Sequence, residues 1–291
     1  MRADMEDDRA AVTEEPRPAS RLPADLKPRL IAGIVLAVLA GGAAWAGSSL
    51  FALLVLAIAL LMSWEWARVV RGGAIDATLV VHAVSVVMAV ALGANGLAAL
   101  GLSAVLAGTF IVIALELGEH ALLSAAGVLY TGLPSVALLW FRGGEPWGLW
   151  AILFLFAVVW STDTVAYASG RLIGGPKLMP MVSPNKTWAG FIGGVAAAAL
   201  AGSLFHLPTG SSPYILGLIG LGLGVVSQAG DLAESALKRA FGVKDASALI
   251  PGHGGFMDRA DGIVAAAVVA ALLALFLDPE APAQALLVHP R

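Results

Sequence analysis

The chain has 291 residues, of which 59% are hydrophobic and only 13% are charged, with a formal net charge of -3. A soluble domain carries about 25% charged residues, so this chain has too few to cover a water-facing surface. It has no cysteine, which excludes disulfides, thiolate metal sites and a cysteine nucleophile. The composition therefore predicts an integral membrane protein.

The first 28 residues differ from the rest because they are polar and contain several prolines. Such a segment buries too little apolar area to offset its ordering entropy, so we expect a disordered cytoplasmic tail at 1–28. A secretory signal peptide would place its apolar region nearer the start. Residues 29–291 are expected to form a single membrane-embedded catalytic domain.

From residue 30 onward, apolar runs alternate with short polar breaks, and about 20 apolar residues are needed to cross the hydrocarbon. The pattern predicts an all-α, polytopic membrane protein with about nine transmembrane helices and no soluble domain. The expected helices are 30–46, 48–66, 78–92, 96–115, 121–140, 147–169, 188–206, 214–230 and 263–277. Their many Gly and Ala residues favour close approach between helices.

The basic residues indicate an orientation. With nine crossings, every Lys and Arg except Arg142 and Arg291 falls in the tail or in the loops after the second, fourth, sixth and eighth helices. Cytoplasmic loops carry an excess of Lys and Arg, so we expect the tail and these loops to be cytoplasmic.

The strongest concentration of chemically useful side chains lies at 230–262. Asp231, Glu234, Ser235 and Lys238 are spaced so that they share one face if the eighth helix continues beyond its apolar run. An acid directly after an apolar run, such as Asp231, is costly at membrane depth and usually functional. The alternative is a solvated helix end in which Glu234 and Lys238 form an ordinary pair.

Two further acids, Asp258 and Asp261, stand three residues apart at the start of the ninth helix and follow a His-Gly-Gly sequence at 253–255. The glycines allow close backbone approach and leave N–H groups free for phosphate oxygens. Mg²⁺ takes one or two carboxylates and completes its shell with phosphates and water. Together with Asp231 these acids predict a magnesium site; the alternative is that they only complement the helix dipole.

The loop after the sixth helix is the second polar concentration and is expected on the same face. Ser183, Lys186 and Thr187 are suited to bind phosphate oxygens, although an ordinary turn before the seventh helix is the alternative. Asp163, inside an apolar helix, needs a partner. Glu65 and Arg68 on the second helix are expected to form only an interfacial pair.

The C-terminal half resembles a known family. Ser235, Lys238, Arg239 and the Lys244-Asp245 pair, followed by the run HGGFMDRAD at 253–261, resemble the signature of phosphatidate cytidylyltransferases (CDP-diacylglycerol synthases). Supporting matches are Gly230-Asp231, Asp163-Thr164 and SPNKT at 183–187, so the resemblance covers about 160–262. Two departures are Asn185, where the family usually has lysine, and Ala189, where it has glutamate.

The resemblance implies transfer of the cytidylyl group of CTP to phosphatidic acid, giving CDP-diacylglycerol and pyrophosphate. The lipid phosphate is then the nucleophile, so positioning and charge neutralisation would supply most of the catalysis. Mg²⁺ is the implied cofactor, with two cation sites expected and the second ion undefined. The expected catalytic residues are Asp231, Lys238, Asp258 and Asp261, the three aspartates also being the expected metal ligands. The expected substrate-binding residues are Ser183, Lys186, Thr187, Ser235, Arg239, Lys244, His253, Gly254 and Gly255.

The implied partners are CTP, phosphatidic acid and the lipid bilayer, with no nucleic acid, and a homodimer is left open. The implied location is a bacterial-type inner (plasma) membrane, with the N-terminus and the site loops cytoplasmic. Three alternatives differ in chemistry. A CTP-dependent polyprenol or phytol kinase would release CDP, a CDP-alcohol phosphotransferase needs an acidic helix motif that is missing, and a transporter would place ionisable residues near the bilayer midplane.

Overall fold

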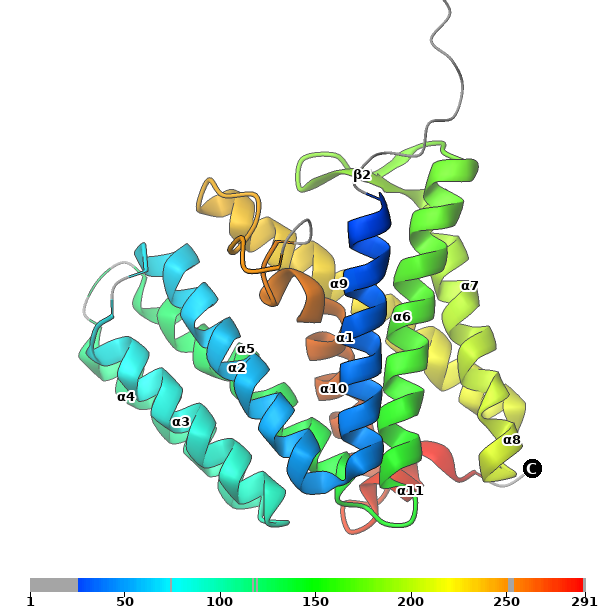
Figure 1. Ribbon diagram of the computed structural model, residues 1–291, viewed down its shortest axis with the longest axis horizontal. Coiled ribbons are helices and arrows are strands. Elements are labelled where there is room, and N and C mark those ends of the chain that lie inside the picture. Colours follow the sequence, from blue (N-terminus) through cyan, green and yellow to red (C-terminus); the bar gives the residue numbers. More distant parts are fainter. Residues whose placement is uncertain (1–25, 74, 117, 119, 251–253, 290–291) are drawn as a thin grey trace, which may run out of the picture.

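The computed structural model describes residues 26–73, 75–116, 118, 120–250 and 254–289. The described chain is almost entirely helical, with one two-stranded sheet (Figure 1). The predicted tail at 1–28 lies outside the described residues, apart from 26–28, which begin the first helix. The elements are α1 (Leu26–Ala46), α2 (Ser48–Arg71), α3 (Ala77–Ala94), α4 (Ala98–Leu115), α5 (Ala121–Arg142), α6 (Gly148–Leu172), β1 (Lys177–Met179), β2 (Ser183–Thr187), α7 (Trp188–Leu204), α8 (His206–Thr209), α9 (Pro213–Ala240), α10 (Met257–Leu277) and α11 (Pro282–Leu287).

Each predicted transmembrane segment corresponds to one long helix, namely α1 to α7, α9 and α10. Among the described residues, eight helices are long and apolar enough to cross a membrane, and α1 adds the shorter apolar stretch Gly33–Ala46. The predicted all-α, polytopic membrane architecture is therefore confirmed. The short helices α8 and α11 and the strand pair were not predicted.

The long helices form two groups, which are visible on opposite sides of Figure 1. In one group, α3 and α4 pack against each other and against α5, and α2 packs against α5 and α3. In the other, α7 packs against both α6 and α9. α10 joins the groups because it contacts α9, α5, α6 and α2.

Small residues bring the helices of the second group into backbone contact, as the composition predicted. A Cβ atom added to Gly202 on α7 would lie 2.6 Å from the carbonyl oxygen of Leu216 on α9. A Cβ atom added to Gly194 on α7 would lie 2.8 Å from the carbonyl oxygen of Thr162 on α6. Larger side chains at these glycines would push the helices apart.

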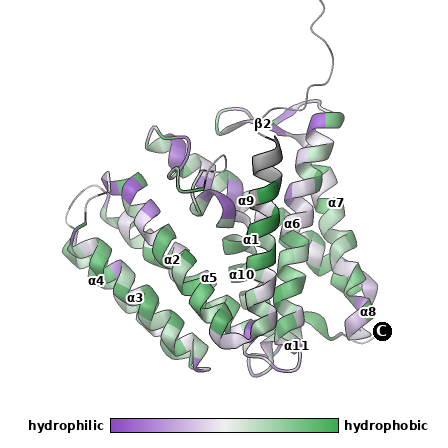
Figure 2. Cartoon of the chain, in the orientation of Figure 1, coloured by the Kyte–Doolittle hydropathy of each residue, from purple (hydrophilic) through white to green (hydrophobic). Residues whose placement is uncertain are grey.

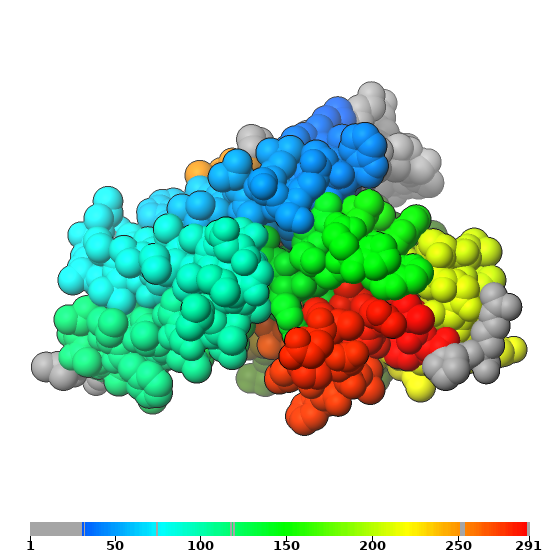
Figure 3. All heavy atoms as spheres, turned by 90° about the horizontal axis from the view of Figure 1, so that it is seen from below, coloured from blue at the N-terminus to red at the C-terminus, as the bar shows by residue number. Residues whose placement is uncertain are grey.

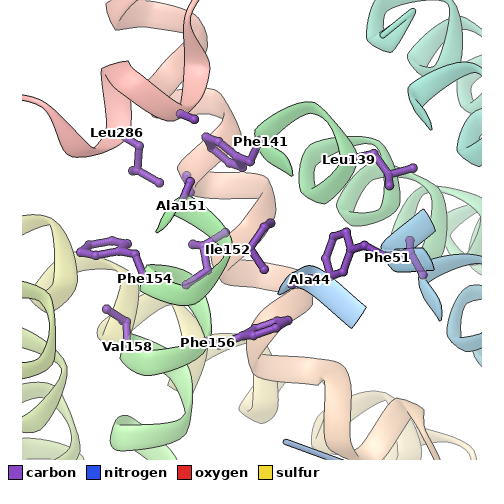
Figure 4. Close-up of a cluster of buried hydrophobic side chains, with 14 of the residues drawn as sticks. Ala44, Phe51, Leu139, Phe141, Ala151, Ile152, Phe154, Phe156, Val158 and Leu286 are labelled. Atoms are coloured by element: carbon purple, nitrogen blue, oxygen red, sulfur yellow. The ribbon is translucent and has the colours of Figure 1, made fainter. Parts of the chain in front are cut away.

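The apolar core lies where the two groups meet. Figure 4 shows Phe51, Phe141, Ile152, Phe154 and Leu286 converging from α2, α5, α6 and α11, and all five are almost completely buried. In the view from below in Figure 3, the C-terminal segment is packed beside the α5–α6 region, in agreement with the contacts of α11 to α5 and α6. This end of the core is thereby closed.

Hydrophilic residues gather at the other end of the bundle (Figure 2). There β1 and β2 form an antiparallel pair that places Lys177 opposite Thr187 and Met179 opposite Ser183. The ion pair between Lys186 on β2 and Asp231 on α9 joins this strand pair to the 230–262 region. The expectation that the two polar loops lie on one face is confirmed.

Candidate active site

The face of α9 predicted from residue spacing exists, because the helix continues beyond its apolar run to Ala240. The solvated helix end considered as an alternative does not fit, since the side chains of Glu234 and Lys238 are only 1% and 8% exposed. Their Oε2 and Nζ atoms lie 2.7 Å apart. Asp231, one turn earlier, is half-buried and lies nearer the surface.

Asp231 connects α9 to the strand pair. Its Oδ2 atom lies 2.7 Å from Nζ of Lys186, and Ser235 Oγ donates to its Oδ1 atom at 3.4 Å. The side chains of Lys186 and Asp231 keep 22% and 33% of their surface exposed. This carboxylate therefore remains accessible to a ligand while its charge is partly offset.

Asp261 on α10 approaches Asp231 because α9 and α10 meet at Gly230. A Cβ atom on Gly230 would lie 2.9 Å from the carbonyl oxygen of Asp261. Asp231, Glu234 and Asp163 all lie within electrostatic range of the Asp261 carboxylate, whose Oδ1 accepts from the Gly262 N–H at 2.7 Å. Carboxylates from three helices thus converge.

Asp163 joins these acids from α6, where it is exposed. It lies within electrostatic range of Asp231, Lys186 and Arg259, so the polar neighbours expected for an acid in an apolar helix are present. We refer to Asp163, Lys186, Asp231 and Asp261 as the outer cluster.

A second group of charges is more deeply enclosed. Lys238 bonds through Nζ to Oδ1 of Asp258 and also pairs with Glu234. The Asp258 Oδ2 atom accepts from the N–H groups of Gly255 at 2.7 Å and Ala246 at 3.1 Å. Both oxygens of Asp258 therefore have donors within the protein, and the ammonium group of Lys238 is directed at two carboxylates.

Glu65 extends this enclosed group and corrects the sequence interpretation. It is fully buried, and its carboxylate accepts hydrogen bonds from the 245–257 loop and from the start of α10. Arg68 is exposed and lies over the ring of Trp64, with 5.7 Å between the guanidinium carbon and the ring centroid. The predicted Glu65–Arg68 interfacial pair is wrong. We refer to Glu65, Glu234, Lys238 and Asp258 as the inner cluster.

The glycine loop serves the inner cluster. Gly254 adopts a φ of 83°, in the left-handed region that glycine tolerates, and a Cβ there would lie 2.8 Å from Oδ2 of Asp258. The N–H of Gly255, which the sequence left free for phosphate, donates to Asp258 instead. His253 lies outside the described residues.

The remaining predicted substrate-binding residues are spread over the polar end. Thr187 is buried and caps α7 by accepting the Gly190 N–H at 3.1 Å. Arg239 donates to the carbonyl oxygen of Val243 at 2.9 Å, Lys244 is exposed, and Ser183 is half-buried on β2. Of this predicted set, Lys186 and Ser235 contact Asp231 directly.

Asp231 and Asp261 suit a magnesium ion better than Asp258 does. Within the described ranges, no three Asp, Glu or His side chains are grouped so that they could hold an ion by themselves. Mg²⁺ needs only one or two carboxylates when substrate phosphates complete its shell, which fits Asp231 and Asp261. The assignment of Asp258 to metal stays a prediction, and its two oxygens are already hydrogen-bonded.

Comparison with known proteins places this geometry in context. Residues 27–277 match the Cytidylyltransferase family. The chain belongs to the cytidylyltransferase family. Phosphatidate cytidylyltransferases of Brucella suis and Brucella melitensis are each 43% identical over 265 residues, covering 89% of this chain and 97% of theirs. That of Bacillus subtilis is 44% identical over 138 residues, covering 47% of this chain and 51% of its own.

These findings confirm the family and the enzyme class predicted from the signature residues. The bacterial relatives and the eight apolar helices also support a multi-pass membrane cytidylyltransferase. The match extends well beyond the 160–262 region that carried the resemblance, because it includes the N-terminal helices.

Two residues of the cytidylyltransferase site could not be found from the sequence. Besides Glu65, α5 contributes Tyr130, whose ring lies 4.9 Å from that of Trp66. The Tyr130 hydroxyl is buried without a hydrogen-bond partner among the described residues, and it lies within electrostatic range of Asp261. No local motif marks either residue, because both reach the site through helix packing.

Proposed function

We propose that this cytidylyltransferase transfers the cytidylyl group of CTP to phosphatidic acid, forming CDP-diacylglycerol and pyrophosphate. The observation that carries the proposal is the outer cluster, in which Asp231 and Asp261 stand beside Lys186 at the polar end of an apolar bundle. Relatives named phosphatidate cytidylyltransferase that align with 89% of the chain support the choice of acceptor.

The reaction joins two anions. An oxygen of the lipid phosphate attacks the α-phosphorus of CTP, a new P–O bond forms, and the bond to the bridging oxygen breaks as pyrophosphate leaves. No serine or cysteine nucleophile is required, so the protein must mainly position the substrates and offset their charge. This agrees with a site built from carboxylates and bases.

Asp231 and Asp261 would hold a divalent cation, and Lys186 would offset phosphate charge beside them. When bound, the cation neutralises the phosphates and stabilises the attacking and leaving oxygens. Ser235, which donates to Asp231, would keep that carboxylate oriented. Lys238 and Asp258 would support the start of α10 from below, since they bond to each other.

The position of the site also fits substrates that arrive from two phases. The outer cluster lies where the hydrophilic residues gather, and apolar helices extend away from it (Figure 2). We propose that this face is cytoplasmic, since all bases except Arg142 and Arg291 lie in the tail or on that side. CTP would enter from the cytoplasm and the lipid phosphate from the bilayer.

Product analysis tests the proposal. Purified protein incubated with CTP, Mg²⁺ and phosphatidic acid should release pyrophosphate and form a lipid with the mass of CDP-diacylglycerol. In parallel reactions with a polyprenol or phytol as acceptor, no CDP should form. Release of CDP together with a phosphorylated alcohol would instead identify a CTP-dependent kinase and overturn the proposal.

A further inference from the structure

Glu65 lies near the end of α2, against the loop that precedes α10. Its Oε1 atom accepts from Ser247 Oγ at 2.5 Å and from the Phe256 N–H at 2.9 Å, and its Oε2 atom accepts from the Met257 N–H at 2.6 Å. The carboxylate is fully buried. In the part of the chain that the structure describes, no base forms an ion pair with it.

The electrostatic reason for this arrangement is the start of α10. The first N–H groups of a helix have no partner within the helix, and the positive end of its dipole favours an acid. Phe256, at the N-cap of α10, provides no side-chain cap. Glu65 supplies the missing acceptor from another helix, and the two backbone N–H groups together with Ser247 stabilise its buried charge.

The same loop segments contact Asp258 through adjacent residues. Ala246 and Gly255, whose N–H groups donate to Asp258, directly precede Ser247 and Phe256, which donate to Glu65. The loop is therefore held between the two carboxylates. A Cβ atom on Gly255 would lie 2.7 Å from Cδ of Glu65, so glycine is needed there for close approach to Glu65.

The surrounding packing makes α2 a rigid support for this loop. Met62, Trp66 and Val69 of α2 form one buried cluster with Ala246 and Met257. Trp66 is fixed in turn because its Nε1 donates to the carbonyl oxygen of Leu123 at 2.8 Å. A shift of α2 would thus reach the first turn of α10.

We propose that Glu65 is a positioning residue for the cytidylyltransferase reaction, holding the 245–257 loop and the first turn of α10 so that Asp258 and Asp261 keep their places. This inference rests on the proposed function, since those carboxylates are the ones assigned to the site. It gives the N-terminal half of the chain, through α2, a specific part in catalysis.

The test compares Glu65→Gln with Arg68→Gln on the same helix. The amide in Glu65→Gln cannot accept the Met257 N–H through its nitrogen, so the loop loses a restraint. We expect kcat for CTP and phosphatidic acid to fall about 10- to 100-fold, as for other groups that orient site ligands, with KM for CTP changed less than threefold. Hydrogen exchange measured by mass spectrometry should increase in peptides covering 245–258. Arg68→Gln should match the wild type in both measurements.

A graded variant covers the case in which Glu65→Gln does not fold. Ser247→Ala removes one donor to Oε1 and leaves both backbone bonds, so kcat should fall about two- to fivefold with a smaller increase in exchange. Unchanged exchange, unchanged kcat, or equal losses in Arg68→Gln would each overturn the positioning role. The exchange measurement needs no substrate, so it still tests how Glu65 holds the loop if the wild type proves inactive with CTP and phosphatidic acid, which would count against the proposed function alone.

Discussion

The outer and inner clusters contain similar side chains but differ in how their charges are satisfied. In the inner cluster, Glu65 and Asp258 receive hydrogen bonds on both carboxylate oxygens and are buried. In the outer cluster, Asp163 is exposed and Asp231 keeps a third of its side-chain surface accessible. Carboxylates with a full set of internal donors fix the shape of the loop, whereas those with incomplete sets remain available for a cation and phosphates. The comparison predicts that outer substitutions reduce activity alone and inner substitutions reduce both activity and stability.

The largest loss of activity is expected for Asp231→Asn in the outer cluster. Removing this charge should lower kcat/KM about 100- to 1,000-fold and raise the Mg²⁺ concentration needed for half-maximal rate. The melting temperature in detergent should stay at the wild-type value, because the side chain is partly exposed. Asp278→Asn, at the C-terminal end of α10, is the matched control and should keep full activity.

Asp258→Asn should have a smaller effect on rate but should also destabilise the protein. Its Oδ1 and Oδ2 atoms accept from Lys238, Gly255 and Ala246, so the substitution weakens a buried network. We expect activity to fall about 10- to 100-fold and the free energy of unfolding to fall by about 1–3 kcal/mol. A variant that is inactive but as heat-resistant as the wild type would place Asp258 in the outer cluster.

Lys186→Gln tests whether the base of the outer cluster offsets substrate charge. We expect kcat/KM to fall about tenfold, mainly through KM, because a hydrogen bond to a charged group is lost. Lys177→Gln on the paired strand β1 is the control, since Lys177 is exposed. Equal losses in the two variants would show that only the general positive charge of the strand pair matters.

The smallest effect is expected from moving α9 and α10 apart without changing any charge. In Gly230→Ala, the added Cβ would lie 2.6 Å from Cβ of Ala265, so the helices must separate slightly. We expect a loss of activity of about fivefold, because overpacking of this kind costs about 1 kcal/mol. Gly222→Ala on the same helix meets nothing within 4 Å and should leave activity unchanged, which steady-state kinetics on the pair will check.

The sequence predicted the helices and much of the site, for reasons that lie in local patterns. Long apolar runs located every transmembrane helix, and the spacing of Asp231, Glu234 and Lys238 predicted their common face. The role of Glu65 could not be predicted, because its partners are 182 to 192 residues away and depend on how α2 packs against the loop. Neither could the division into inner and outer clusters, since burial of Lys238 depends on the position of α10.

The strand pair was missed for a related reason. β1 and β2 are only three and five residues long, and β2 contains Pro184 and Asn185, which disfavour strands. Their pairing brings Lys186 to Asp231 by tertiary contact rather than by local propensity.

The most direct test of the proposed reaction follows the two ends of the triphosphate. CTP labelled at the α-phosphorus and CTP labelled at the γ-phosphorus are each incubated with the purified protein, Mg²⁺ and phosphatidic acid. We expect the α label in the lipid and the γ label in pyrophosphate, with both transfers strongly reduced in Asp231→Asn. Recovery of the γ label in the lipid, or full transfer by Asp231→Asn, would contradict cytidylyl transfer at this site.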